Sequence, residues 1–251
     1  MKKISFIVLV LIIASTCLAD ETLYFVGVEN VRPFAYQEKG QVTGYDVDLF
    51  MEIARLAELK VRVELMPFKR SWVYLQDGAV DGTFMVYYRK DREEKILYSS
   101  RPIHTFKYHI FVKKGREFPF TGLKDLYGKR VGNQMGFTVT PEFESAVTEK
   151  CITLEEATDI DMNIRKLDSG RVDCYISTPR LVKNYTDSMG ITDQIAMLPR
   201  PIVPDKKMYV ALSLNSRRIK DKKAVMARID KAMKAMEKNR FVDTMEAKYF
   251  K

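Results

Sequence analysis

A seven-residue pattern occurs twice in the chain and constrains its fold more than any other feature of the sequence. "LQDGAVDGTF" occupies residues 75–84 and "LDSGRVDCYI" occupies residues 167–176, so both contain Leu-x-x-Gly-x-Val-Asp. In each copy the leucine ends an amphipathic run, and the glycine can adopt positive φ and end a helix. An apolar run then follows Val-Asp. The repeat therefore predicts a helix followed directly by a strand at two equivalent places in the chain.

The segments around each copy complete the same plan. Short apolar runs alternate with helical periodicity, which is typical of parallel α/β units. We expect strands at 22–28, 61–68, 79–87, 129–134, 151–154 and 172–177, and helices at 45–59, 71–77, 140–149 and 159–170, with Ser71 as the cap of the second helix. These elements form two βαβαβ units. The chain is thus predicted to be an α/β protein with two lobes, each a doubly wound and mostly parallel sheet, and a cleft where strand carboxyl ends meet.

The N-terminal segment has the layout of a secretory signal peptide. Lys2 and Lys3 are followed by an apolar run at 4–13, and Cys17-Leu18-Ala19 supplies small residues before a cleavage site. We predict cleavage after Ala19 and export to the periplasm, with residues 1–19 as the signal peptide. An uncleaved anchor and a lipid-modified Cys17 are the alternatives, although Ala14-Ser15-Thr16 is a poor match to the segment that precedes a lipidated cysteine.

Composition limits the classes of function. The chain has 251 residues, 46% hydrophobic and 30% charged, as expected of a globular protein. Its net charge of +9 favours anionic ligands or an acidic partner, but many lysines fall on the polar face of the last predicted helix, where they would simply be solvated. No nucleic-acid motif is present, and we predict no nucleic-acid partner.

The sequence lacks the patterns that catalysis or cofactor binding would require. We find no nucleophile motif, glycine-rich phosphate loop or Cys/His cluster. His104 and His109 are five residues apart, a spacing that places them on opposite faces of a strand and suits no metal pair. The sequence therefore predicts no cofactor, no metal and no enzymatic activity.

Several segments resemble the family 3 extracellular solute-binding proteins, the periplasmic receptors of polar amino-acid ABC transporters. "GYDVDLFMEIARLA" (44–57) is similar to the family's signature segment, and "DLYGKRVGNQMGFT" (125–138) is similar to the start of its second lobe. "DREEKILYSSRPI" (91–103) resembles the passage that closes the first lobe, and the segment after 223 resembles the terminal helices. The resemblance implies a type II periplasmic binding protein fold.

The resemblance also implies domain boundaries. Lobe one would comprise residues 20–111 plus 208–251, and lobe two residues 112–207, with two chain crossings forming a hinge. In the family's strand order, the strands that carry Cys151 and Cys174 are separated by a third. Two strand spacings are roughly 10 Å, beyond the Cα reach of about 7 Å for a disulfide, so we expect two buried free thiols.

The ligand contacts implied by the resemblance are only partly present. Family members bind the α-carboxylate with an arginine of lobe one, which corresponds to Arg92, and its guanidinium fork suits a carboxylate. They bind the α-ammonium with an acid of lobe two, where this chain has Ser177 and Thr178. The threonine expected before Arg92 is Arg89, and one hydroxyl of the lobe-two turn is replaced by Phe137. An unpaired buried ammonium is costly, so the ligand is either an ordinary amino acid or a carboxylate or other small polar or aromatic compound.

The other candidate contacts are aromatic walls and a possible replacement acid. Phe34 and Phe68 would form walls of the pocket, although both also suit core packing, and Glu29 could supply the missing negative charge. The complete set of predicted ligand-binding residues is Glu29, Phe34, Phe68, Arg70, Met85, Tyr87, Arg92, Gln134, Phe137, Thr138, Ser177 and Thr178.

The sequence thus predicts a monomeric periplasmic solute-binding protein. It would capture a small carboxylate-bearing ligand by hinge closure and deliver it to an ABC permease in the membrane. The alternatives are a soluble sensory receptor that acts on a membrane kinase or chemoreceptor and, from another class, a dehydratase-like enzyme on the same fold.

Overall fold

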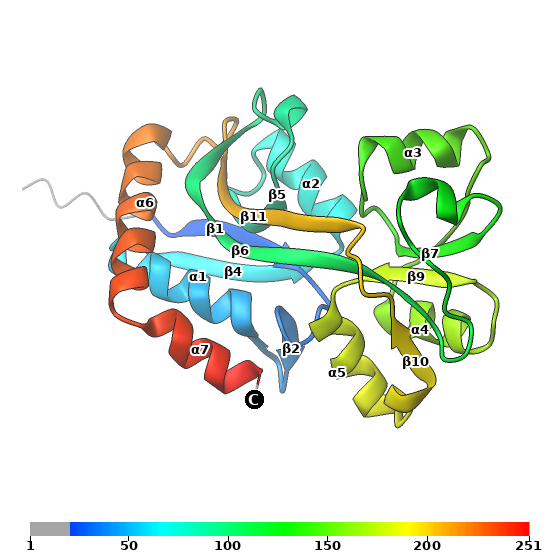
Figure 1. The fold of residues 1–251 in the computed structure, drawn as a ribbon. Helices are drawn as coiled ribbons and strands as arrows, with labels where there is room; N and C mark the ends of the chain where they lie inside the picture. Colours follow the sequence, from blue (N-terminus) through cyan, green and yellow to red (C-terminus); the bar gives the residue numbers. More distant parts are fainter. Residues whose placement is uncertain (1–20, 251) are drawn as a thin grey trace, which may run out of the picture.

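The computed structural model describes residues 21–250 and divides them into two α/β lobes (Figure 1). The predicted signal peptide lies outside the described residues, so its cleavage stays a prediction. The two-lobed fold, with parallel strands in each half, confirms the expected fold class.

The first lobe is built on three parallel strands with the first strand of the chain in the middle. β1 (Leu23–Val28) pairs with β4 (Val61–Met66) on one side and β5 (Gly82–Tyr87) on the other. α1 (Tyr45–Leu56) and α2 (Phe68–Asp77) make the connections. The prediction that Ser71 caps α2 was wrong, because the helix begins at Phe68, directly after Pro67, and Ser71 lies buried inside it.

The second lobe repeats this order. β7 (Arg130–Gln134) lies between β8 (Thr153–Ala157) and β9 (Cys174–Ser177), and all three are parallel. Its helices are α3 (Pro141–Thr148), α4 (Ile160–Asp168) and α5 (Pro179–Met189). The predicted strand at 151–154 starts later, at Thr153, because the Cys151 amide donates to the Ala146 carbonyl and still belongs to the end of α3.

Two long antiparallel strands join the lobes. β6 (Ile96–Lys113) and β11 (Val203–Ser213) pair with each other and give one continuous sheet in the order β4-β1-β5-β11-β6-β9-β7-β8, as the ribbons that run between the lobes in Figure 1 show. β6 pairs with β11 from Ile96 to Tyr108, and with β9 from His109 to Phe111. The change of partner falls close to the predicted boundary at 111 and 112, which stays a prediction.

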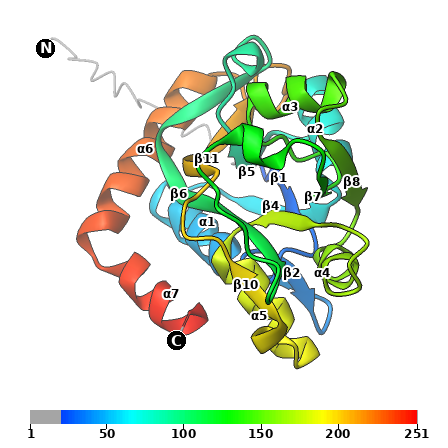
Figure 2. The same ribbon diagram turned by 45° about the vertical axis from the view of Figure 1, so that its right-hand side comes forward.

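The remaining elements are short or C-terminal. α6 (Lys222–Lys238) packs against α1 and β6, and α7 (Phe241–Tyr249) packs against α1, so both cover the first lobe (Figure 2). The others are β2 (Tyr36–Glu38), β3 (Gln41–Thr43), β10 (Ile195–Met197) and the 3-10 turns η1 (Lys90–Arg92), η2 (Leu123–Leu126) and η3 (Thr192–Gln194).

The repeated sequence pattern has one structural role in both lobes. Gly78 directly follows α2 and Gly170 lies two residues after the end of α4, and their φ values are 73° and 74°. Asp81 then binds the main chain of Tyr24 in β1 twice, through its amide at 2.8 Å and its carboxylate at 2.7 Å. Asp173 makes the same pair of contacts with Arg130 in β7, both at 2.8 Å. The pattern therefore ends a helix and locks the third strand of each lobe against the first.

The two cysteines of the described residues, Cys151 and Cys174, are free thiols, and β7 lies between their segments as expected. Cys174 is fully buried, and burial raises the pKa of its thiol to about 12. Cys151 is half-buried and precedes β8, so the expectation of two buried thiols holds only for Cys174.

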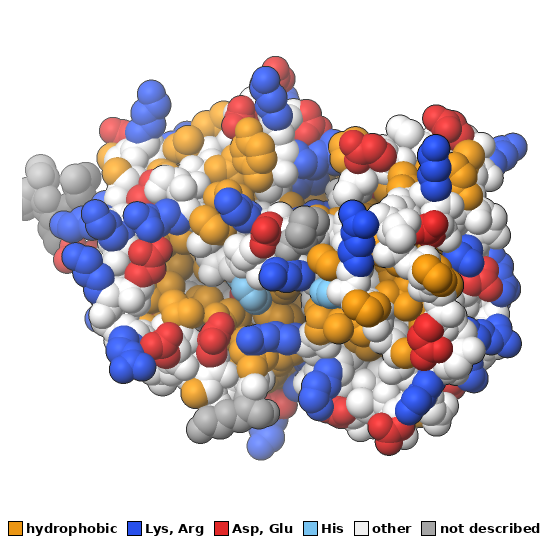
Figure 3. Space-filling model, viewed as in Figure 1, with side chains coloured by type: hydrophobic (Ala, Val, Ile, Leu, Met, Phe, Trp, Pro, Cys, Tyr) orange, Lys and Arg blue, Asp and Glu red, His pale blue; other side chains and the backbone are white. Residues whose placement is uncertain are grey.

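Charged side chains are dispersed over the surface. Figure 3 shows Lys and Arg over both lobes, interspersed with Asp and Glu on the face in view. Within residues 21–250 no helix has the length and apolar character needed to span a membrane.

Candidate functional site

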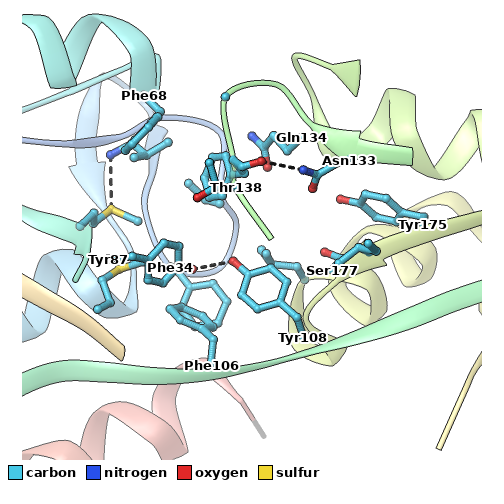
Figure 4. Close-up of a pocket in the computed structure, with 18 of the residues that line it drawn as sticks. Phe34, Phe68, Tyr87, Phe106, Tyr108, Asn133, Gln134, Thr138, Tyr175 and Ser177 are labelled. Carbon is cyan, nitrogen blue, oxygen red and sulfur yellow. Dashed lines mark hydrogen bonds between the residues drawn. The ribbon is translucent and has the colours of Figure 1, made fainter. Parts of the chain in front are cut away.

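A cavity lies between the lobes, where the carboxyl ends of β1, β5, β7 and β9 converge on β6 (Figure 4). About 750 Å³ of empty space, open solvent at the mouth included, lies within its walls. Its lining consists of Val28, Val31, Phe34, Phe68, Met85, Tyr87, Arg92, Phe106, Tyr108, Asn133, Gln134, Gly136, Phe137, Thr138, Tyr175, Ile176, Ser177, Leu181 and Met208.

Aromatic rings form much of the wall. Phe106 and Tyr108 alternate along β6, so they point to the same face of the strand. Phe34 packs edge-on against Phe106, with ring centroids 5.0 Å apart. Phe68 of the first lobe lies 5.6 Å from Phe137 of the second, so the two lobes touch across the cavity.

Two tyrosines on that wall share a hydrogen bond. The hydroxyls of Tyr87 and Tyr108 bind each other in Figure 4. Burial, and then the nearby Tyr108 hydroxyl, raise the pKa of Tyr87 well above its usual value. Burial raises the pKa of Tyr108 to about 12. Both hydroxyls therefore stay neutral near pH 7.

Arg92 supplies the charge at the site. It follows β5 in the turn η1, is only 7% exposed, and donates from Nη1 to the Tyr87 carbonyl at 3.3 Å. Its guanidinium carbon lies 4.5 Å from the ring of Trp72 and 5.6 Å from that of Phe68. Burial lowers its pKa. The neighbouring Asp91 pairs with Arg89 instead, and among the described residues no acid forms an ion pair with Arg92.

A second cation lies at the edge of the cavity. Lys206, on β11, donates from Nζ to the carbonyls of Thr138 and Val139 in the second lobe. The same nitrogen lies 4.7 Å from the ring centroid of Tyr87 and 5.5 Å from that of Tyr108. Burial lowers the pKa of Lys206 to about 8. No sequence pattern had indicated this residue.

The second lobe supplies neutral polar groups. Asn133 is buried at the end of β7 and donates to the Phe137 carbonyl at 2.7 Å, which shapes the turn that carries Thr138. Ser177 ends β9 and is buried beside Tyr175. These groups can donate and accept hydrogen bonds, but they bring no charge.

The structure places most of the predicted contacts together. Nine of the twelve line this cavity: Phe34, Phe68, Met85, Tyr87, Arg92, Gln134, Phe137, Thr138 and Ser177. Glu29 lines only an adjoining opening, Arg70 is exposed on α2, and Thr178 caps α5 by accepting from the Leu181 amide at 3.4 Å. Those three side chains therefore lie outside the lining.

The prediction missed part of the wall: Val28, Val31, Phe106, Tyr108, Asn133, Gly136, Tyr175, Ile176, Leu181 and Met208. The alternation in "TFKYH" would have indicated a strand with two rings on one face. Asp46, in the first turn of α1, is fully buried, and its Oδ1 lies 3.2 Å from His104 Nδ1. Its other oxygen has no hydrogen-bond partner among the described residues.

Two α/β lobes joined by paired long strands, with an enclosed cavity between them, define a two-lobed ligand-binding protein. The family model described as "Bacterial extracellular solute-binding proteins, family 3" matches residues 24–251. The chain belongs to this family.

Individual relatives are distant but extend over most of the chain. The Bacillus subtilis (strain 168) protein named "Probable amino-acid-binding protein YxeM" is 23% identical over 92% of this chain and 84% of its own length. "An ancestral arginine-binding protein bound to arginine" superposes with a TM-score of 0.76 at 24% identity, covering 92% of this chain and 98% of its own. A histidine kinase sensor domain similar to periplasmic binding proteins also superposes with a TM-score of 0.76. It is 18% identical and covers 91% of this chain and 96% of its own. At such identities, the similarity to these two solved structures shows that this chain shares their fold.

Proposed function

We propose that this protein captures a small carboxylate-bearing ligand in the cavity between its lobes and delivers it to an ABC permease. Membership of a solute-binding family and the name of the relative YxeM, an amino-acid-binding protein, support the binding of a small ligand. The signal-like N-terminus supports export to the periplasm. The proposed role is capture and release without turnover, by a monomer.

The single observation that carries the proposal is the state of Arg92. Its guanidinium is buried at the cavity wall, next to aromatic rings and unpaired with any described acid. Burying a charge without a partner is costly, so this arrangement favours binding of an anionic group from outside. A carboxylate matches the planar fork of donors.

Closure of the lobes provides the means of capture. β6 and β11 are the two strands that pass between the lobes, and bending of a few residues in such strands is a common route to hinge motion. Phe68 and Phe137 meet across the cavity, so a ligand enclosed there would be shielded from water on both sides.

A thermal-unfolding screen tests the proposal. Protein lacking residues 1–19 would be heated with amino acids, monocarboxylates, dicarboxylates and the neutral amide of each acid. A ligand at a thousand times its Kd stabilises the folded state by about 4 kcal/mol, and we expect such stabilisation from acids only. Equal stabilisation by the amides would contradict a carboxylate ligand.

A sensory role is the second candidate, and the similar sensor domain favours it over an enzyme. Both a permease and a membrane kinase would bind the outside of the closed form. Co-purification of the liganded protein with a permease subunit would favour transport. Retention by a sensor kinase ectodomain alone would favour signalling.

The export step has its own measurement. The intact mass of the secreted protein should equal that of a chain that begins at Asp20. A mass that includes residues 1–19 would contradict cleavage.

A further inference from the structure

The cavity between the lobes is positively charged and contains no acid. Among the nineteen lining residues, all of them described, Arg92 is the one charged side chain. Lys206 adds a second cation behind Tyr87 and Tyr108. Seven of the lining residues are aromatic, and six of the other twelve carry aliphatic or methionine side chains.

Four acids on elements around the cavity are bound to protein groups or lie in another opening. Asp91 accepts two bonds from Arg89, and the Glu144 carboxylate accepts from the Val139 amide at 3.0 Å. Asp46 faces His104 outside the lining. Glu29 lines the adjoining opening, across the wall that Phe68, Gln134 and Phe137 share between the two spaces.

Aromatic rings can also hold an ammonium group, through its attraction to the face of the ring. In this cavity the protein's own cations already use three of them. Arg92 lies near Phe68, and Lys206 lies near Tyr87 and Tyr108. A ligand ammonium placed at these rings would therefore meet two positive charges at close range, where repulsion in a partly desolvated site is strong.

From these contacts we infer that the site takes an organic anion with an aromatic or branched apolar body and no ammonium group, rather than a zwitterionic amino acid. The inference rests on the proposed function and names its ligand class. Arg92 binds the carboxylate, Lys206 adds favourable charge, and the rings enclose the apolar body. Asn133, Gln134, Thr138 and Ser177 offer neutral hydrogen bonds to further polar atoms of the ligand.

Matched compounds test the inference by calorimetric titration of the mature protein. 3-Phenylpropionate and phenylalanine differ only in the α-ammonium, as do 4-methylpentanoate and leucine, while 3-phenylpropanamide lacks the carboxylate charge. We expect at least one of the two acids to bind at least 30-fold more tightly than its amino acid, and the amide to bind at least as weakly as phenylalanine.

A variant that changes only the charge of the cavity wall provides a second test with the same compounds. Gln134→Glu changes an amide of the cavity wall into a carboxylate of nearly the same shape. The ratio of the Kd of an acid to the Kd of its matched amino acid should shift at least tenfold in favour of the amino acid. The thermal midpoint of the variant is the folding control. An unchanged ratio in this variant would overturn the inference.

The outcomes separate the inference from the proposed function. Tighter binding of phenylalanine and leucine, with Glu29→Gln abolishing that preference, would overturn the inference and leave carboxylate capture standing. Equal binding of the amide and the acid would overturn both. No binding by these compounds, by any standard amino acid or by any acid of the screen would also overturn both.

Discussion

The charge on Arg92 is the residue-scale feature on which recognition depends. We predict that Arg92→Met weakens carboxylate binding by more than about 100-fold, because two charge-assisted hydrogen bonds are lost at about 1.5–3 kcal/mol each. The measurement is the Kd by titration calorimetry. Arg89→Met is the matched control, since Arg89 is half-exposed and paired with Asp91, and it should change the Kd less than threefold. A similar loss in both variants would point to general charge rather than to a specific contact.

Lys206 gives the site a predicted pH dependence. Its pKa is lowered to about 8 by burial, with Glu144 opposing the effect and Arg92 and Arg89 reinforcing it. Protonated Lys206 attracts an anion, so that contribution is present below about pH 8 and is lost as the pH rises through that value.

We therefore expect the affinity for a carboxylate ligand to fall by about three- to tenfold between pH 7 and pH 9, in line with one coupled proton. Lys206→Arg should keep its charge, so its affinity should stay high and change little between pH 7 and pH 9. Lys206→Met should also change little with pH, but at the lower affinity that the wild type has at pH 9. A fall of the same size in all three proteins would assign the titration to another group.

At the scale of elements, the repeated pattern provides a matched pair of glycines. A Cβ at Gly78 would collide with the backbone carbonyl of Asn215, whereas a Cβ at Gly170 would meet nothing nearer than an Arg116 guanidinium nitrogen at 3.8 Å. We predict that Gly170→Ala lowers the free energy of unfolding by about 1 kcal/mol from backbone strain alone, and Gly78→Ala by about 3 kcal/mol or more. Urea unfolding measures both, and equal losses would contradict the collision.

Elements with strong local patterns were predictable from sequence, and contacts between distant strands were not. The helices and parallel strands of both lobes follow from periodicity and from the glycine that ends α2 or α4. β6 was not among the predicted strands. The alternation at 105–109 is a local signal for part of it, but nothing local reveals that 18 residues pair with β11, β9 and β10 in turn.

The same limit applies to the site. Arg92 and the rings at 34, 68 and 137 could be identified from the family resemblance, whereas Phe106 and Tyr108 lie on the unpredicted strand. Glu29 illustrates the opposite error: it directly follows Val28 in sequence, yet Val28 lines the cavity and Glu29 lines only its neighbour. Which way a side chain points after the end of a strand is set by tertiary packing.

At the scale of the whole molecule, contacts between the lobes set the balance between open and closed forms. The Tyr185 hydroxyl of α5 donates to the Asn30 carbonyl of the first lobe at 2.9 Å, outside the cavity lining. Loss of this bond in Tyr185→Phe removes about 1 kcal/mol from the closed form, so ligand affinity should fall by about fivefold although no ligand contact changes.

Titration calorimetry would give that affinity, and small-angle X-ray scattering would give the compaction on ligand binding. Tyr127→Phe, on an exposed side chain of the second lobe, is the control. Unchanged affinity in Tyr185→Phe would show that this contact does not bias closure.

The second lobe begins and ends at two neighbouring strands, since β6 leads into it and β11 leads out. The chain thus enters and leaves the second lobe at adjacent positions, at the end of β6 and the start of β11. The segment of a relative that corresponds to residues 114–202 could therefore replace this one without any change in the path of the first lobe. Arg92 would remain in such a chimera while Asn133, Thr138 and Ser177 were exchanged. Evolution can thus retune what surrounds the carboxylate in one half of the protein while the half that binds it is conserved.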